Sequence, residues 1–406
     1  MLWRGMLLAG AALAAAKPAW AEPITLGASG RLTLLAGGFA QDAPFPEEPA
    51  VGRINAEVYA EKVLNNGVSV KIVFGAAVER DHPRRDPRGG RAGNCPAENP
   101  LCPGIDGRAA RGYLSGFTAG GPVDNQDVRT ALEQAYVLVR GAYGEFSLGR
   151  DEGVAARFSL PPPNILPAGD LLQAPIDLTG FSGLIARNDV SGQSFKLAAA
   201  TPRLLGLRVG LSYTPALEAQ GVDQGYRRGP AQPLTADPRH LVEFGASFDH
   251  TWRSGWRTRL AGSYASGGDA TGLAAFERLE SWSYGAGLSR ASWSFGVSRV
   301  GSDNALAGVR RGYRATSLSI VRERGAWAGM LSGGWGREDL AALRLSAVTL
   351  GARYKAMKSL SFFGGITAAQ RAVPVLADGF PGGVLSERER TIGAFLGASY
   401  SLRAIF

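Results

Sequence analysis

The side chains that could carry acid–base catalysis are few in this chain of 406 residues. Its three histidines are His82, His240 and His250, and within a predicted strand His250 has an acid directly beside it, Asp249. Adjacent residues of a strand point to opposite faces, so Asp249 could not orient the ring of His250 if both lie in one strand. The sequence therefore predicts that the chain is not an enzyme.

The two cysteines, Cys95 and Cys102, lie in a segment rich in proline, glycine and arginine. In an oxidising compartment, two cysteines this close in the chain would form a local disulfide. The alternative is a zinc site, which needs further ligands, and His82 is the one histidine of this region. Six residues between two cysteines is also not a usual zinc spacing. We expect the disulfide, and we expect no bound metal, with calcium left open.

The N-terminus carries the features of an export signal. Arg4 precedes a short apolar run over 5–16, and Ala19 and Ala21 form a small-x-small cleavage site. The alternative, a membrane anchor, would need a longer apolar run. We expect residues 1–21 to be removed, leaving 22–406 as the mature chain.

Loss of Arg4 and Lys17 lowers the net charge from +9 to +7. An exported chain meets no nucleic acid, so this charge belongs in a pore or beside acidic lipid.

Beyond residue 22, short segments alternate apolar and polar residues and end in turn residues. This weak period of two is typical of strands with lipid on one face and water on the other. Sixteen strands are predicted, at 24–39, 51–63, 68–80, 128–140, 145–150, 193–201, 207–214, 240–252, 256–264, 282–290, 293–300, 315–322, 326–336, 343–354, 360–369 and 391–406.

Long and short connections between these strands alternate without exception. The long ones fall at 40–50, 81–127, 151–192, 215–239, 265–281, 301–314, 337–342 and 370–390. Such alternation is typical of an outer-membrane barrel with long outer loops and short periplasmic turns. The predicted fold is therefore all-β, an antiparallel transmembrane barrel of sixteen strands in which the first strand pairs with the last and leaves no open edge.

Tyrosines and tryptophans lie near the ends of the predicted strands, as interface girdles require, although aromatic residues favour strands in any case. They are Tyr213, Trp252, Trp256, Tyr264, Trp282, Trp293, Trp335, Tyr354 and Tyr400.

Two stretches resemble the general bacterial porin family, and a third resembles a signal common to most outer-membrane barrels. Residues 135–150 read AYVLVRGAYGEFSLGR and are similar to the porin segment that leads into the constriction loop. Residues 195–197 and 201–215, FKL and TPRLLGLRVGLSYTP, are similar to a later hairpin of that family. The end, GASYSLRAIF, resembles the aromatic signal, here Tyr400 and Phe406, that outer-membrane assembly machinery reads. One departure is the absence of the PEFGG sequence known from enterobacterial loops, since 160–164 read LPPPN.

The resemblance implies a trimer whose 151–192 loop folds inward and constricts the pore. It also implies that acids of this loop face a basic cluster on the wall across a narrow point, where rings of charge set ion preference. The loop acids are Asp151, Glu152, Asp170, Asp177 and Asp189. The basic residues on predicted lumen faces are Arg31, Arg53, Lys71, Arg257, Arg259 and Arg353. For each of these charges, a solvated loop or rim position is the alternative.

The expected function is passive diffusion of small hydrophilic solutes and ions through an outer-membrane pore, with a weak preference for anions. The expected partners are two further copies of the chain, outer-membrane lipid, lipopolysaccharide and the barrel assembly machinery. A substrate-specific channel is the first alternative, and a non-conducting barrel with an adhesive surface role is the second.

Overall fold

The structure is a computed structural model that describes most of the chain. The described residues are 23–42, 48–82, 104–105, 108–111, 128–172, 176, 178–179, 181, 184–217, 234–274, 276–305, 307, 312–339, 343–376 and 384–406. The predicted signal segment, Cys95, Cys102 and Asp177 lie outside these residues.

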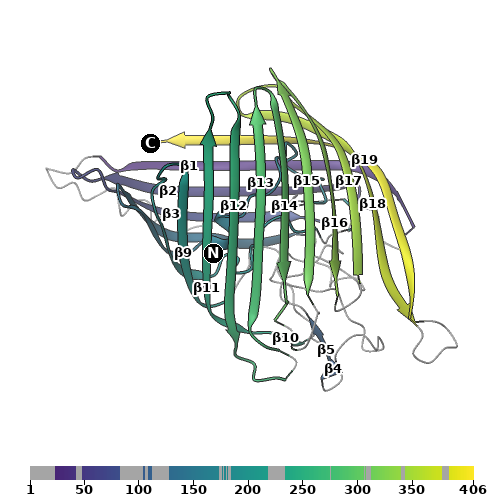
Figure 1. The fold of residues 1–406 in the computed structure, drawn as a ribbon. Helices are drawn as coiled ribbons and strands as arrows, with labels where there is room; N and C mark the ends of the chain where they lie inside the picture. The colour runs from purple at the N-terminus through teal and green to yellow at the C-terminus, as the bar shows by residue number, and fades with distance from the viewer. Residues whose placement is uncertain are drawn as a thin grey trace.

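Sixteen antiparallel strands form one closed barrel, as the alternation predicted (Figure 1). The strands are β1 (Thr25–Gln41), β2 (Ala50–Val63), β3 (Ser69–Arg80), β6 (Arg129–Gly141), β7 (Gly144–Arg150), β8 (Phe195–Ala200), β9 (Leu207–Ala216), β11 (Pro238–Thr251), β12 (Arg257–Asp269), β13 (Leu279–Arg290), β14 (Trp293–Ser302), β15 (Tyr313–Arg324), β16 (Trp327–Glu338), β17 (Leu343–Lys355), β18 (Leu360–Leu376) and β19 (Val384–Ile405).

The barrel closes where β1 pairs with β19. The pairing runs without a shift from Gly27 opposite Ile405 to Gln41 opposite Thr391. Beyond it, the backbone N–H of Phe406 donates to the carbonyl of Leu26 at 2.8 Å. The prediction that the first and last strands meet is confirmed, and the closure leaves no strand edge of the barrel unpaired.

The two faces of the wall follow the alternation of the sequence. Leu34 of β1 and Ile54 of β2 point outward and are 51% and 49% exposed. Thr33, next to Leu34 in β1, points to the other face and is 5% exposed. Directly paired residues share a face, so Thr33, its partner Arg53 on β2 and Glu79 on β3 line the interior. The outside is thus an apolar band that requires lipid or another copy to cover it.

Short turns join the strands at one end of the barrel. Gly67, Gly255 and Gly325 in three of these turns have φ between +60° and +80°, a region that glycine enters without the clash of a Cβ. The long connections lie at the opposite end, together with β4 (Gly104–Ile105), β5 (Arg108–Arg111) and β10 (Leu234–Thr235) (Figure 1).

Several boundaries differ from the prediction. The connection predicted at 370–390 is largely a hairpin, since β18 and β19 stay paired from Leu360 opposite Tyr400 to Leu376 opposite Val384. The three-stranded sheet of β4, β5 and β10 was not predicted, and β10 joins β5 in parallel. Its strands are two to four residues long, too short for a period of two to mark them in sequence.

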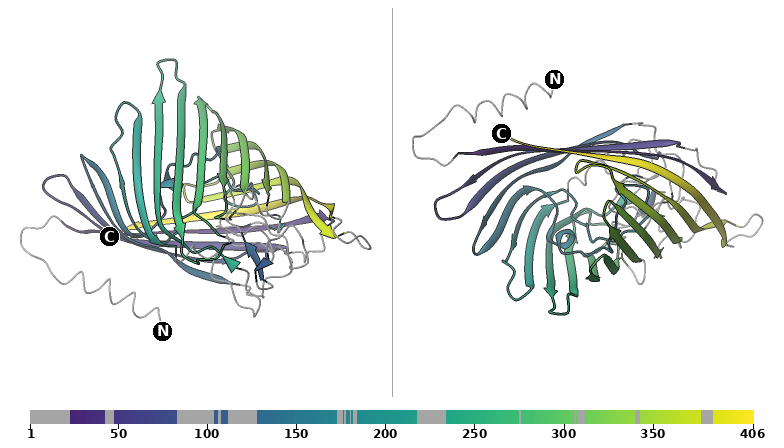
Figure 2. Two further views of the ribbon diagram at one scale, coloured as in Figure 1. Left: turned by 60° about the horizontal axis from the view of Figure 1, so that its bottom comes forward. Right: turned by 90° about the horizontal axis from the view of Figure 1, so that it is seen from above.

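Inside the barrel, the 151–192 loop begins with one helical turn, α2 (Val154–Arg157). The view from above in Figure 2 shows this turn within the ring of strands. Among the described residues, no helix is long and apolar enough to cross a membrane.

Candidate functional site

The start of the 151–192 loop is held to the wall by buried polar groups. Lys196 of β8 is 1% exposed, and its ammonium donates to the carbonyls of Asp151 and Gly192, so one side chain ties both ends of the loop. Glu243 of β11 is fully buried, accepts from the Val154 N–H at 3.1 Å and contacts the Ser212 hydroxyl. The sequence did not predict that Lys196 and Glu243 hold the loop, because a charged residue in a strand gives no sign of its partner in a distant loop.

The ends of the loop also carry two ion pairs. Arg157 contacts the Asp151 carboxylate, and Arg187 donates to Glu152 at 2.8 Å. Burial raises the pKa of Asp151 although Arg157 acts in the opposite direction. At Glu152, burial alone would raise the pKa of the carboxyl, but the charge and hydrogen bond of Arg187, together with the charges of Arg157 and Lys196, outweigh burial and lower that pKa. Asp151 and Glu152 are therefore paired within the loop itself and do not face the predicted basic wall.

Asp170, another predicted loop acid, is buried in the far part of the loop. Its carboxylate accepts from the Leu172 N–H at 3.1 Å and from the Asn164 amide at 3.0 Å, and lies 3.5 Å from the Ser332 hydroxyl of β16. Burial raises the pKa of Asp170 to about 6, while the bonds from Leu172 and Ser332 act to lower it. Asp189, at the other end of the loop, is half-buried near Lys196.

Inward-facing glycines give the loop its path along the wall. A Cβ added at Gly285 would collide with the carbonyl of Leu160, and one at Gly296 would lie 2.5 Å from Pro163. Further along, a Cβ at Gly351 would lie 2.7 Å from Leu166. Real Cβ atoms do not approach so closely, so each glycine creates a recess that loop atoms fill.

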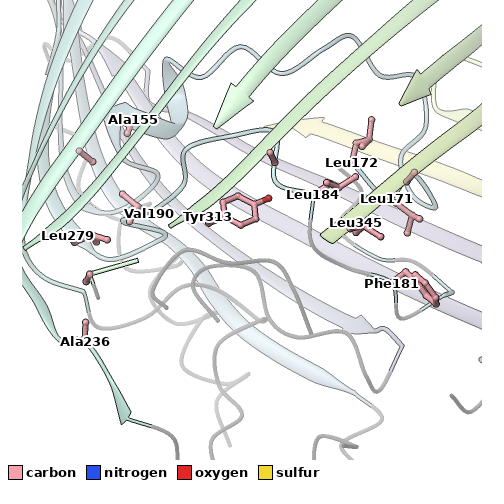
Figure 3. Close-up of a cluster of buried hydrophobic side chains, with 14 of the residues drawn as sticks. Ala155, Leu171, Leu172, Phe181, Leu184, Val190, Ala236, Leu279, Tyr313 and Leu345 are labelled. Atoms are coloured by element: carbon pink, nitrogen blue, oxygen red, sulfur yellow. The ribbon is translucent and has the colours of Figure 1, made fainter. Parts of the chain in front are cut away.

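Apolar side chains line other parts of the wall that the loop covers. One cluster joins Ile165, Leu166 and Ile176 of the loop to wall residues such as Leu35 and Phe363. A second cluster joins Leu171, Leu172, Phe181 and Leu184 to Tyr313 and Leu345 (Figure 3). The Tyr313 hydroxyl also accepts from the Ile185 N–H at 2.8 Å. We expected these inner faces to meet water. That expectation was wrong over this part of the wall, because the loop removes it from solvent.

The predicted basic residues of β1 to β3 line another part of the interior. Arg53 donates to Glu79 and to Glu133, both at 2.6 Å, and Lys71 lies 3.6 Å from Glu57. Arg31 is exposed and lies 3.4 Å from the Ser401 hydroxyl. Two of the three cations therefore face carboxylates of the wall, and these carboxylates were not singled out in the sequence.

The other predicted basic residues lie apart from this group. Arg257 and Arg259 are on β12 near its short turn, and Arg257 forms a pair with Asp249 at 2.5 Å. Arg353 pairs with Glu323 at 2.6 Å and reaches the Ile165 carbonyl at 3.5 Å. Arg353 therefore contacts the loop directly.

An arginine group that the sequence did not reveal gathers around Glu145 of β7. Arg208 lies 2.6 Å from this carboxylate, Arg140 3.4 Å and Arg157 3.9 Å. The four residues come from β6, β7, β9 and the loop. Arg157 also pairs with Asp151, so three arginines face two carboxylates and leave a net positive charge. The alternation of polar and apolar residues along β6 and β9 could have placed Arg140 and Arg208 on the lumen face, but it could not show that they share Glu145.

At the C-terminus, Tyr400 is 40% exposed and pairs with Leu32 of β1 and Leu360 of β18. Phe406 is 79% exposed beyond the last strand. Their role as an assembly signal stays a prediction. Within the described part of the chain, no group of three or more His, Cys, Asp or Glu side chains could hold a metal ion.

Comparison with known proteins gives the same architecture. The anion-selective porin from Comamonas acidovorans is similar in structure, with a TM-score of 0.51 and 12% identity over 94% of this chain and 99% of that one. In-vitro folded OmpT, an outer membrane protein of Vibrio cholerae, has a TM-score of 0.51 and 10% identity over 95% of this chain and 100% of its own. At such identity, the likeness shows the fold alone. No curated protein matches the sequence.

The family itself is shown by sequence. The profile of the Gram-negative porin family matches residues 7–371, which is most of the chain. Members of this family and fold are outer-membrane channels and are in general not enzymes. With a closed barrel of sixteen strands and a profile match of this length, the chain belongs to the Gram-negative porin family.

Proposed function

We propose that the protein is a diffusion porin, a water-filled channel through which small hydrophilic solutes and ions cross the outer membrane passively. The observation that carries the proposal is the division of the lumen wall. Its apolar part, around Leu35, Phe363 and Leu345, is covered by the loop, and its charged part, around Arg53, Lys71 and Glu145, is not part of those clusters. A polar passage between the loop and the charged parts of β2, β3, β6 and β7 follows from that division.

In this proposal the 151–192 loop is the constriction. This role of the loop is supported by the contacts that hold it to the wall, from Lys196 of β8 to Ser332 of β16. Charge at the narrow point would come from the arginines around Glu145 as well as from the acids of the loop. Because the three arginines outnumber the two acids that they contact, Glu145 and Asp151, we propose a preference for anions.

Single-channel recording in a planar bilayer tests the proposal. We expect steady open steps whose conductance rises linearly with salt concentration. Sugars of increasing size should enter protein-loaded liposomes at rates that fall with size and do not saturate. Saturation by one solute at low concentration would instead support a substrate-specific channel. If folded protein gave no open steps, the adhesive alternative would replace the porin proposal.

We also propose that the functional unit is a homotrimer. The support is the outward face of β1 and β2, where the small residues Ala28, Gly30 and Ala56 lie side by side, with Gly30 directly opposite Ala56. Flat, small side chains let two barrel walls approach closely. A native gel before and after heating tests this proposal, since a trimer would run at three times the monomer mass until heat separates it.

A further inference from the structure

Two apolar side chains of β6, Tyr136 and Leu138, face the lumen between the start of the 151–192 loop and the short turns. Val137 and Val139 alternate with them and are 38% and 37% exposed on the outer face of the barrel. Adjacent residues of a strand point to opposite faces, so Tyr136 and Leu138 point inward. Both are half-buried. We call Tyr136 and Leu138 the lumen patch.

The lumen patch remains partly open to the lumen. In the part of the chain that the structure describes, the apolar clusters that the loop forms with the wall contain neither residue of the patch. On β7, the partner of Leu138 is Ser147 and the partner of Tyr136 is Gly149. No large side chain of β7 therefore stands beside the patch, which forms an apolar surface within a polar passage.

Two tyrosines face this part of the lumen, and the ring of one is already covered. The ring of Tyr59 on β2 lies over Gly27, where an added Cβ would collide with it, and the Nζ of Lys71 lies 3.9 Å from its centroid. Among the described side chains, no cation and no second ring lies on Tyr136. The ring of Tyr136 is therefore the aromatic surface here that a solute can cover.

Arg140 lies two residues beyond Leu138 on the same face of β6 and can bind a further anion. Its side chain is 60% exposed, and its one ion pair within the described chain is the contact with Glu145 at 3.4 Å. Arg208 holds Glu145 more closely, at 2.6 Å. A guanidinium carries five N–H donors, so most donors of Arg140 remain open to a solute. At about 3.3 Å per residue, the Cα atoms of Arg140 and Leu138 are about 7 Å apart, a spacing that a small aromatic acid can bridge.

The charges around the lumen patch decide the direction in which a solute would lie. The hydroxyl of Tyr136 is within electrostatic reach of the carboxylates of Asp151 and Glu57. A solute carboxylate would be repelled at that end of the patch and attracted to Arg140 at the other end. The ring of the solute would then lie on Tyr136 and Leu138.

We propose that the lumen patch and Arg140 form a subsite for aromatic monocarboxylates on their way through the pore. The ring gains from offset stacking and from burial of apolar surface, and the carboxylate accepts two hydrogen bonds from the guanidinium. A small aliphatic anion gains only the second contribution, and a neutral aromatic solute only the first. The inference rests on the proposed function, because the solute must enter the lumen, and it names a class of solute within that function.

Weak binding suits such a subsite. The surface on offer is two half-buried side chains and one exposed arginine, which is small and open to water. We expect a dissociation constant on the order of 1 mM, at which the solute still leaves readily. The subsite would raise the concentration of aromatic acids in the passage without closing it to other solutes.

Single-channel recording with added solutes tests the inference on the full-length refolded protein. In potassium chloride at neutral pH, benzoate should interrupt the open current briefly, and equal concentrations of acetate or benzyl alcohol should do so about tenfold less often. Arg140→Gln should lower the frequency of benzoate interruptions about tenfold, because charge-assisted hydrogen bonds are lost. Arg259→Gln is the matched control, since it removes one arginine from the inner face of β12, and it should stay within about twofold of wild type.

Substitutions at Leu138 and Tyr136 test the contact with the ring. Leu138→Asn removes apolar surface and should lower the frequency of benzoate interruptions several-fold. Leu138→Met keeps the apolar surface at the same position and should behave as wild type. Tyr136→Leu keeps an apolar side chain but removes the aromatic ring, so benzoate should lose its advantage over cyclohexanecarboxylate. Tyr136→Leu also provides the test if Leu138→Asn does not fold.

Binding can also be measured without an open channel. The fluorine NMR line of a fluorinated benzoate should broaden when folded protein in detergent is added, compared with empty micelles. Arg140→Gln should remove most of this broadening, and Arg259→Gln should leave it as in wild type. Equal broadening by wild type and Arg140→Gln would overturn the inference.

Two results from the recordings would also overturn it. If acetate interrupted the current as often as benzoate, the lumen patch would play no part. If Arg140→Gln and Arg259→Gln lost the effect equally, the overall field of the lumen would replace a local subsite. Both results can occur in a channel with steady open steps, so they leave the proposed function intact. A lack of open steps would instead refute the proposed function, and the NMR comparison would still decide this inference.

Discussion

At the scale of single residues, Asp170 is the acid whose surroundings differ most from water. It is 1% exposed and held by Asn164, Leu172 and Ser332. Burial raises its pKa from 3.8 to about 6. Because the folded pKa is the higher one, the docked loop gains its full stability from this group below pH 3.8 and loses it as the pH rises through about 6.

Asp170→Asn should therefore make docking of the loop independent of pH between about 4 and 7. A shift of about two pKa units corresponds to about 3 kcal/mol at most. Hydrogen exchange of the Leu172 amide, corrected for its intrinsic rate, measures this. Wild type should lose protection as the pH rises, and the variant should not. Asp237→Asn, at a half-buried acid outside the loop, is the control. If protection of the Leu172 amide fell with rising pH as much in Asp170→Asn as in wild type, other groups would be responsible for the pH dependence.

Arg53 is the cation that joins two carboxylates of the wall. Arg53→Met removes the guanidinium from Glu79, whose side chain is fully buried, and from Glu133. Breaking such a buried pair costs about 3–5 kcal/mol. The unfolding free energy from urea titration should fall by that order, and adding Glu79→Gln should recover part of the loss. If the double variant were no more stable than Arg53→Met, the unpaired charge of Glu79 would not be the cause of the lost stability.

At the scale of elements, the loop and the wall are shaped for one another. The wall supplies recesses at Gly285, Gly296 and Gly351, and the loop fills them with Leu160, Pro163 and Leu166. Gly169 has a φ of +83°, and a Cβ there would lie 2.7 Å from the ring of Phe395. Both the path of the loop and its turn at residue 169 thus depend on missing side chains.

Gly285→Val should push the loop away from β13. If the loop is the constriction, single-channel conductance should rise and the open state should become noisier. Gly329→Val is a matched control, because Gly329 has open space around a Cβ and faces outward on β16. Both variants should shift on a gel only after heating, as folded barrels do. Identical traces from the two folded variants would argue against a constricting loop.

At the scale of the whole molecule, the arrangement of charge around Glu145 should set ion preference. Arg208→Gln removes the arginine closest to Glu145, at 2.6 Å, and weakens the positive patch. The ratio of anion to cation permeability, from the reversal potential in a salt gradient, should fall by roughly twofold. Arg322→Gln, on the outer face near Trp293, should leave the ratio unchanged. A strong cation preference of wild type would refute the proposed lean toward anions.

The sequence by itself determined the barrel. The period of two decides which side of each strand meets lipid, and the alternation of long and short connections decides the strand number and antiparallel order. It also led to the family through the segments at 135–150 and 201–215. These are local signals, readable within ten to twenty residues, and the structure bears out the fold that they predict.

Only the tertiary structure decided where the charges and the loop meet. Asp151 and Glu152 pair with arginines of their own loop, Arg53 pairs with wall acids, and Lys196 binds the backbone carbonyl of Asp151, 45 residues away in sequence. Polarity in a strand shows that a residue faces the lumen but not which partner it has there. That partner depends on how distant strands align around the barrel and on how the loop crosses it, which no local pattern records.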